Sequence, residues 1–132
     1  MGALFLDSSA LVKLVVREPE TDALLGFLGS PRRPILISEI AITEVTRDAR
    51  RVGADAERVL AECEVILLRS AELVAAATME PADLRTLDAI HLAAASAVAE
   101  HLDAFVAYDR RLLRAARALG LAVASPGVTT PR

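Results

Sequence analysis

Short, unbroken apolar runs alternate along this chain with longer amphipathic segments, and this alternation limits the folds open to it more than any other feature. The pattern predicts strands at residues 3–6, 34–37, 65–68, 104–107 and 121–124. Strands that are apolar throughout and separated by helices are typical of a parallel sheet buried on both faces. The sequence therefore predicts an α/β fold of three α/β/α layers with a mostly parallel central sheet.

Residues that cap or end helices mark the segments between these runs. Asp7, Ser38 and Ser70 stand where three helices are expected to begin. Further helices are predicted at 20–28, 54–62, 86–100 and 110–119. We find no linker, repeat or low-complexity tract, so residues 1–132 are expected to form a single domain. Ligands of such folds bind at the carboxyl ends of the strands, where functional residues are therefore expected.

Composition excludes several classes of protein. The only cysteine, Cys63, cannot form an internal disulfide or a cysteine-only zinc site, and it is interpreted as a small buried hydrophobe. The sequence has no apolar run of membrane-spanning length and no secretory leader, which predicts a cytoplasmic protein without a membrane partner. The net charge of −3 and the 3% aromatic content are not typical of a nucleic-acid-binding surface.

Two aspartates follow predicted strands. Asp7 comes directly after the first strand, and Asp109 follows the fourth strand after Ala107 and Tyr108. Both carboxylates are therefore expected at the carboxyl edge of the sheet. Each could instead act only as a helix N-cap, because an aspartate side chain readily accepts a hydrogen bond from a first-turn N–H group.

Two further acids lie within largely apolar helices. Glu44 is flanked by Thr43 and Val45, and Asp88 lies between Leu87 and Ala89. Burying a lone charge costs several kcal/mol unless the charge is paired or bound to a metal. The alternative is that each acid lies on the solvent face of its helix or pairs with an arginine.

The four acids together suggest a metal site. Carboxylates about 5 Å apart repel by roughly 3 kcal/mol at an effective dielectric constant of 20, so a cluster needs a cation to neutralise it. Mg²⁺ or Mn²⁺ prefers such oxygen ligands. A metal of this kind can lower the pKa of a bound water and stabilise charge on a phosphate, which suits hydrolysis of a phosphodiester. Convergence of the four acids is a hypothesis at this point.

The chain resembles PIN-domain ribonucleases and, more narrowly, the VapC toxins of type II toxin–antitoxin pairs. The resemblance covers essentially the whole chain and is carried by four segments in order: LFLDSSALVKLVVREPET, ISEIAITEV, LRTLDAIHLAAA and FVAYDRRLLRAARALGL. It implies that Asp7, Glu44, Asp88 and Asp109 form an acidic catalytic pocket for Mg²⁺ or Mn²⁺. Asp7 and Asp88 would bind the metal directly, and Glu44 and Asp109 would act through water.

The same resemblance assigns supporting roles. Ser9 matches a hydroxyl that supports the pocket by hydrogen bonding. Ala107 departs from the family pattern, which often has Thr or Ser two residues before the fourth acid, so one supporting hydrogen bond is in question. Independently of the resemblance, four basic residues lie close in sequence to these acids and either bind RNA phosphates or pair with carboxylates: Lys13, Arg47, Arg85 and Arg110. Of these, Lys13 and Arg85 are the preferred candidates for phosphate binding. His91, one helical turn after Asp88, is interpreted as a packed or rim histidine rather than a ligand.

The resemblance implies a metal-dependent endoribonuclease that acts as a growth-inhibiting toxin. It also implies a homodimer and a cognate antitoxin, which would carry the DNA-binding part because this chain shows none. Two alternatives remain: a catalytically weak PIN-like module that binds RNA or protein, and a housekeeping PIN nuclease. Counting the four acids with their metal changes the net charge of the remainder from −3 to +1, so the acidic composition does not exclude an RNA substrate.

Two other α/β phosphoryl-transfer folds also place acids at strand ends, but this chain lacks their essential residues. A receiver domain needs an aspartate after its third strand and a lysine after its fifth, where this chain has Arg69-Ser70 and Ser125-Pro126. A haloacid-dehalogenase enzyme needs a second aspartate two residues after the first, where this chain has Ser9.

Overall fold

The computed structural model describes residues 2–128. Its strands form one sheet in the order β3-β2-β1-β4-β5, and every pairing between neighbours is parallel, as predicted. The strands are β1 (Ala3–Leu6), β2 (Ile35–Ser38), β3 (Glu64–Ile66), β4 (Leu102–Val106) and β5 (Val123–Ala124).

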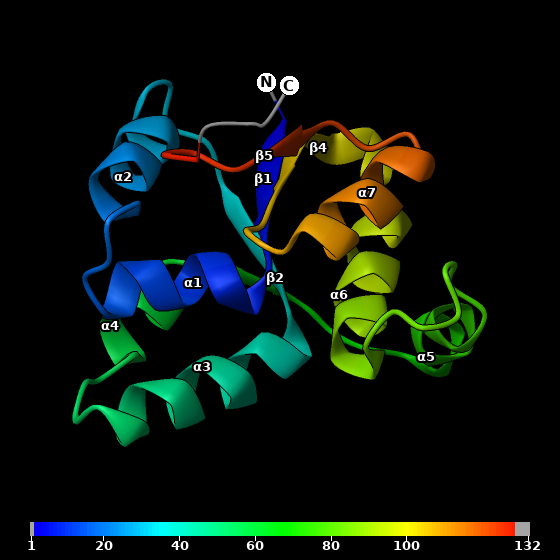
Figure 1. The fold of residues 1–132 in the computed structure, drawn as a ribbon, viewed down its shortest axis with the longest axis horizontal. Coiled ribbons are helices and arrows are strands. Elements are labelled where there is room, and N and C mark those ends of the chain that lie inside the picture. Colours follow the sequence, from blue (N-terminus) through cyan, green and yellow to red (C-terminus); the bar gives the residue numbers. More distant parts are fainter. Residues whose placement is uncertain (1, 129–132) are drawn as a thin grey trace.

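Helices cover both faces of this sheet. Figure 1 shows α1 to α4 on one side of the strands and α5 to α7 on the other, which confirms the three α/β/α layers. The helical segments are α1 (Ser8–Val15), α2 (Thr21–Gly29), α3 (Glu39–Arg51), α4 (Glu57–Ala61), α5 (Ser70–Ala77), α6 (Thr86–Ala97), the 3₁₀ turn η1 (Ala99–His101) and α7 (Arg110–Ala118). Within residues 2–128, no helix combines the length and the apolar character needed to cross a membrane.

An apolar core lies on each face of β1. Leu4 and Leu6 belong to the core formed with α1 and α3, whereas Phe5 belongs to the core formed with α6 and α7. The alternation follows from the strand geometry, in which successive side chains point to opposite faces. The ring of Phe5 stacks on that of Phe105 from β4, with centroids 5.3 Å apart. Burial on both sides explains why this central strand is apolar throughout.

The boundaries of several elements differ from the sequence prediction. The helix expected to be capped by Ser70 is instead capped at Arg69, because the carboxylate of Glu72 accepts a hydrogen bond from the Arg69 backbone N–H at 3.2 Å. The helix expected to run to residue 100 ends at Ala97 and is followed by η1. These shifts leave the order and type of the elements unchanged.

The order in which strands are added to the sheet changes direction at β1. From β1 the chain adds β2 and β3 on one side, and it then crosses back to add β4 and β5 on the other side. In open α/β sheets, a crevice for ligands forms at the carboxyl ends of the strands at such a point. β1 continues directly into Asp7, and β4 leads through Ala107 and Tyr108 to Asp109. The fold thus places two of the predicted site residues at this crevice.

Candidate active site

A cavity of about 390 Å³ opens at the carboxyl edge of the sheet beside β1 and β4. All four acids singled out in the sequence contribute to its wall, although they come from four different segments of the chain. The residues that line the cavity are Asp7, Ser8, Ser9, Glu44, Asp48, Arg85, Thr86, Leu87, Asp88 and Asp109. The expected convergence of Asp7, Glu44, Asp88 and Asp109 on one cavity is therefore present in the structure.

Asp7 is the most deeply buried of these acids, with 2% of its surface exposed. Its Oδ1 atom accepts hydrogen bonds from the backbone N–H of Ala10 at 3.0 Å, which caps α1, and from the Ser9 hydroxyl at 2.7 Å. Burial raises the pKa of Asp7 to about 6, against the lowering effect of these two hydrogen bonds. The carboxyl group is thus held rigidly and is harder to ionise than an ordinary aspartate.

Ser9 also ties the end of β1 to the segment after β4. Its Oγ atom accepts a hydrogen bond from the Tyr108 backbone N–H at 3.1 Å while donating to Asp7. Ala107, at the position where the resemblance suggested a hydroxyl, is fully buried, and its carbonyl accepts a hydrogen bond from the Ser125 hydroxyl at 2.5 Å. The segment leading to Asp109 is therefore held by Ser9 and Ser125, and its position does not depend on a side-chain hydroxyl at residue 107.

Glu44 reaches the cavity from α3 and is held by two polar side chains. The Ser8 hydroxyl donates to Glu44 Oε1 at 2.7 Å, and His91 Nε2 lies 2.5 Å from the same oxygen. Burial acts to raise the pKa of Glu44, but the hydrogen bonds from His91 and Ser8 outweigh it and hold the pKa below its ordinary value. Glu44 is therefore fixed in the ionised form.

Arg85 bridges the other two acids. Its Nη2 atom lies 2.9 Å from Asp109 Oδ2, and its Nε atom lies 3.5 Å from Asp88 Oδ2. Asp109 also caps α7 by accepting a hydrogen bond from the Leu112 backbone N–H at 3.0 Å. Both the capping role and the arginine pairing that the sequence left open are thus present, together with a place in the cavity wall.

The two acids bridged by Arg85 have pKa values shifted in opposite directions. Burial raises the pKa of Asp88, and the charges of Asp109 and Glu44 add to this effect against the opposing influence of Arg85 and His91. For Asp109, burial acts in the raising direction, but the bonds from Leu112 and Arg85 hold its pKa below the ordinary value. The charges of Glu44 and Asp109 therefore act directly on the ionisation of Asp88, as expected of carboxylates that line one cavity.

The donors around the cavity fit a hard divalent cation. Among residues 2–128, five acids line it: Asp7, Glu44, Asp48, Asp88 and Asp109. Arg85 is the only arginine or lysine of this described lining, so negative charge is in excess there. Within residues 2–128, no three or more His, Cys, Asp or Glu side chains are grouped closely enough to hold one metal ion together. Mg²⁺ takes only one or two protein carboxylates and completes its shell with water, so this donor set remains suitable for it.

Three residues of the site were not assigned to it from the sequence. Ser8 and His91 hold Glu44, and Asp48 lies four residues after Glu44 and so shares its side of α3. Helical spacing is a signal that could have found Asp48. His91 is buried, with 1% of its surface exposed, as expected of a packed histidine, but its contact with Glu44 had no signal in the sequence.

Lys13 lies outside the lining of the acidic cavity. Its ammonium group pairs with Glu20 at 2.8 Å and with Glu18 at 3.4 Å, and it lies 4.6 Å from the centre of the Tyr108 ring. The side chain is largely buried. This is the structural pairing that the sequence analysis left open as the alternative to phosphate binding.

Comparisons with known proteins agree with this fold. The family model described as the PIN domain matches residues 4–118. The chain is 43% identical to "Ribonuclease VapC46" of Mycobacterium tuberculosis over 96% of this chain and 99% of that protein. A crystal structure of Mycobacterium tuberculosis VapC20, titled a "Sarcin-Ricin loop cleaving toxin", has a TM-score of 0.71 at 14% identity, covering 86% of this chain and 95% of that one.

A second solved structure covers almost the entire chain. It is titled "Toxin-antitoxin complex from Klebsiella pneumoniae" and has a TM-score of 0.67 at 22% identity, covering 98% of both chains. Likenesses at this level of identity show the shared fold, whereas the family model and the curated relative span most of the sequence itself. The chain therefore belongs to the PIN-domain family, and within it to the VapC group.

Proposed function

We propose that this protein is a metal-dependent endoribonuclease that acts as the toxin of a type II toxin–antitoxin pair. The observation that carries the proposal is the convergence of Asp7, Glu44, Asp88 and Asp109 on one cavity at the carboxyl edge of the sheet. The relationship to a protein named a ribonuclease, at 43% identity over nearly the whole chain, supports RNA as the substrate. The reaction is hydrolysis of a phosphodiester by water.

In this proposal, Asp7 and Asp88 hold Mg²⁺ or Mn²⁺, and Glu44 and Asp109 act through water molecules. The metal would supply Lewis-acid activation of water and stabilisation of negative charge on the phosphate. The protein contributes rigidity: Ser9 fixes Asp7, and His91 fixes Glu44 in its ionised form. Catalytic groups held in place in advance need no reorganisation during the reaction.

Arg85 has two roles in the proposal. Without RNA, it neutralises part of the charge of Asp88 and Asp109. Its guanidinium group is largely exposed, so it can also turn to a phosphate of a bound RNA. Lys13, with its ammonium group held by Glu18 and Glu20, is the weaker of the two candidates for phosphate binding.

The partner in this proposal is a cognate antitoxin. The similarity to a chain from a toxin–antitoxin complex supports it, and the excess of acidic groups in the cavity favours a basic antitoxin side chain facing them. The relationship to VapC proteins also leads us to expect a homodimer, which light scattering on the purified protein can test.

The test of the enzymatic part is incubation of the purified protein with total RNA, with Mg²⁺, with Mn²⁺ and with a chelator. We expect discrete cleavage that requires metal and is lost in Asp7→Asn and Asp88→Asn. Asp83→Asn is the matched control, because Asp83 is an exposed aspartate that pairs with Arg111 outside the cavity. Circular dichroism checks folding. Cleavage that persists in both cavity variants would refute the assignment and favour a weak binding module.

The toxin role needs a separate test in cells. Induction of the wild-type protein in a bacterial host should arrest growth, whereas Asp88→Asn should not. Co-expression of the product of an adjacent gene should restore growth. Normal growth during production of active wild-type enzyme in several hosts would instead indicate a housekeeping PIN nuclease.

A further inference from the structure

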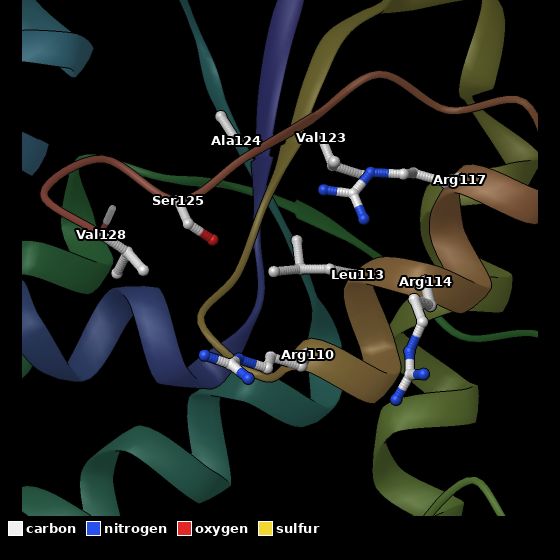
Figure 2. Close-up of a pocket in the computed structure, with 8 residues that line it drawn as sticks. All are labelled: Arg110, Leu113, Arg114, Arg117, Val123, Ala124, Ser125 and Val128. Atoms are coloured by element: carbon white, nitrogen blue, oxygen red, sulfur yellow. The ribbon is translucent and has the colours of Figure 1, made fainter. Parts of the chain in front are cut away.

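A second cavity, of about 400 Å³, lies between α7 and β5 and is lined by three arginines. Arg110, Arg114 and Arg117 line one wall. Figure 2 shows Arg110 and Arg117 on either side of Leu113, with the side chain of Arg117 extending toward Val123. Their spacing of four and three residues places them along one side of the helix. We call this cavity the α7–β5 groove; the rest of its lining is Ala124, Ser125 and Val128.

The charge of the α7–β5 groove is not compensated within the part of the chain that the structure describes. None of the described residues that line it is acidic. None of the ion pairs formed among residues 2–128 involves Arg110, Arg114 or Arg117, whereas Arg111 on the same helix pairs with Asp83. The groove therefore presents three positive charges to solvent.

Helix electrostatics do not explain this row of arginines. Arg117 lies in the last turn of α7, where a cation interacts favourably with the helix dipole, but Arg110 lies in the first turn, where it is unfavourable. Like charges four residues apart, such as Arg110 and Arg114, also repel on a helix surface. A polyanionic ligand would remove both costs.

The row of arginines begins at the acidic cavity. Arg110 directly follows Asp109, whose carboxylate belongs to the cavity wall, and the row extends from there over seven residues, or about 10 Å of helix. The acidic cavity repels phosphates, so an RNA whose reactive phosphate enters it needs its attraction from elsewhere. The α7–β5 groove lies next to it and carries the opposite charge.

We propose that the α7–β5 groove binds the phosphate backbone of single-stranded RNA beside the cleavage position; this inference rests on the proposed ribonuclease function. Arg110 and Arg117 contact successive phosphates, with Arg114 between them in sequence. None of the described residues that line the groove is aromatic, so they offer no stacking platform and contact the RNA backbone rather than the bases. The absence of an aromatic anchor also argues against a peptide as its ligand.

The test measures binding without cleavage. Fluorescence anisotropy with a labelled, unstructured oligouridine in chelator gives the affinity over a series of salt concentrations. For single-stranded nucleic acids, the slope of log K against log salt concentration changes by about 0.7 for each phosphate contact. We expect Arg110→Gln and Arg117→Gln each to weaken binding and to reduce the slope by about this amount, and the double variant to reduce it by about twice as much.

Two control variants separate a specific contact from loss of net charge. Arg111→Gln removes the same charge from the same helix but outside the α7–β5 groove, and its slope should equal that of the wild type. Arg117→Lys keeps the charge and should retain most of the slope. Circular dichroism on every variant verifies the fold. We expect it to be unchanged, because the substituted side chains are exposed and do not belong to the core.

The outcomes distinguish this inference from the proposed function. If the wild type cleaves RNA but the groove variants bind RNA with the same salt dependence as Arg111→Gln, the proposed RNA-binding role of the groove is refuted and the proposed ribonuclease function stands. If the slopes decrease as expected in the groove variants but the wild type cleaves no RNA with any metal, RNA binding by the groove is supported and the proposed ribonuclease function is refuted. The last experiment measures binding of fluorescent polyglutamate by the same variants. If they lose affinity for polyglutamate but retain affinity for RNA, the groove is a site for acidic peptides and the proposal is refuted.

Discussion

His91 Nε2 lies 2.5 Å from Glu44 Oε1, which joins α6 to α3 at the base of the acidic cavity. The imidazole is buried, and the same nitrogen lies 3.1 Å from the Ser8 hydroxyl. Its other ring nitrogen, Nδ1, has no hydrogen-bond partner within the described part of the chain. The described polar contacts of His91 are therefore with Glu44 and with Ser8, which itself donates a hydrogen bond to Glu44.

The first prediction concerns this histidine as a positioning residue. His91→Leu keeps an apolar side chain in the core but removes the hydrogen bond to Glu44, so we expect cleavage to fall by about 10- to 100-fold. His91→Gln can still donate to the carboxylate and should retain more activity than His91→Leu. Initial cleavage rates at saturating metal measure the effect, with thermal unfolding as the check on folding. Equal rates for wild type and a folded His91→Leu would contradict the prediction.

The second prediction is that Asp7→Asn stabilises the metal-free protein at neutral pH. The pKa of Asp7 is raised to about 6 in the folded protein from about 4 in the unfolded chain, so the folded state prefers the protonated form. The stability that this group contributes is present below about pH 4 and is lost as the pH rises through about 6. Above that range the cost approaches about 3 kcal/mol, which a neutral amide avoids while still accepting the capping hydrogen bond from Ala10.

Urea unfolding in chelator at several pH values measures this effect. The difference in the free energy of unfolding between Asp7→Asn and wild type should be largest near pH 8 and shrink toward pH 4. Asp83→Asn, at an exposed position, should show no such trend. A wild type more stable than Asp7→Asn at pH 8 would show that the buried carboxylate is stabilised by a contact other than those described.

The third prediction is that metal-dependent cleavage decreases as the pH falls below about 6. Asp7 binds a proton in that range because burial raises its pKa to about 6, and a protonated carboxyl group is a poor metal ligand. Raising the Mn²⁺ concentration should shift the midpoint to lower pH, since metal and proton compete for the same oxygens. A pH profile that does not respond to Mn²⁺ would place the titrating group elsewhere.

The fourth prediction is that Arg85→Gln binds Mn²⁺ several-fold more tightly than the wild type at pH 8. Arg85 pairs with Asp88 and Asp109, so in the proposed metal site its guanidinium would compete with the metal, and removal of its charge would free both carboxylates. Stability should change little, because the side chain of Arg85 is 77% exposed and such ion pairs contribute little. Titration calorimetry gives the affinity, with Arg111→Gln as the control of equal charge. Weaker Mn²⁺ binding by Arg85→Gln would show that the arginine organises the acids instead of competing for them.

The fifth prediction separates a structural role of Lys13 from RNA binding. Lys13→Met should lower the midpoint of thermal unfolding by several degrees, because it leaves Glu18 and Glu20 without their buried partner. Its affinity for oligouridine in chelator should match that of the wild type. A loss of RNA affinity without a change in thermal stability would restore Lys13 as a phosphate ligand.

The strands and the placement of Asp7 and Asp109 could be predicted because both depend on local patterns, whereas the convergence of Glu44 and Asp88 with them was a hypothesis supported by the resemblance. Apolar runs such as 3–6 and 104–107 mark strands buried on both faces, and parallel strands bring Asp7 and Asp109 to one edge of the sheet. The pairing of His91 with Glu44 could not be predicted in this way. It depends on how α6 passes α3, and the two residues are 47 positions apart.

Arg85 illustrates the same limit. The sequence left open whether this arginine binds phosphate or pairs with carboxylates, since Asp88 is one helical turn away and Asp109 is distant in sequence. The structure brings Asp109 within 2.9 Å through the path of β4 and the start of α7. Side-chain pairing between segments follows from packing, which a single sequence does not specify locally. The N-cap at Arg69 in place of Ser70 has a local cause instead, because the side chain of Glu72, three residues later, accepts a hydrogen bond from the Arg69 backbone N–H.

The strand order has a consequence for how the protein is made. β1 precedes the other strands of the sheet in sequence but lies between β2 and β4. The four acids are divided in the same way, with Asp7 and Glu44 before β3 and with Asp88 and Asp109 after it. A chain whose translation stops before Asp109 therefore lacks one of the four acids of the cavity. In the proposed ribonuclease, the acidic pocket would therefore be completed only after both halves of the sheet have been synthesised and paired.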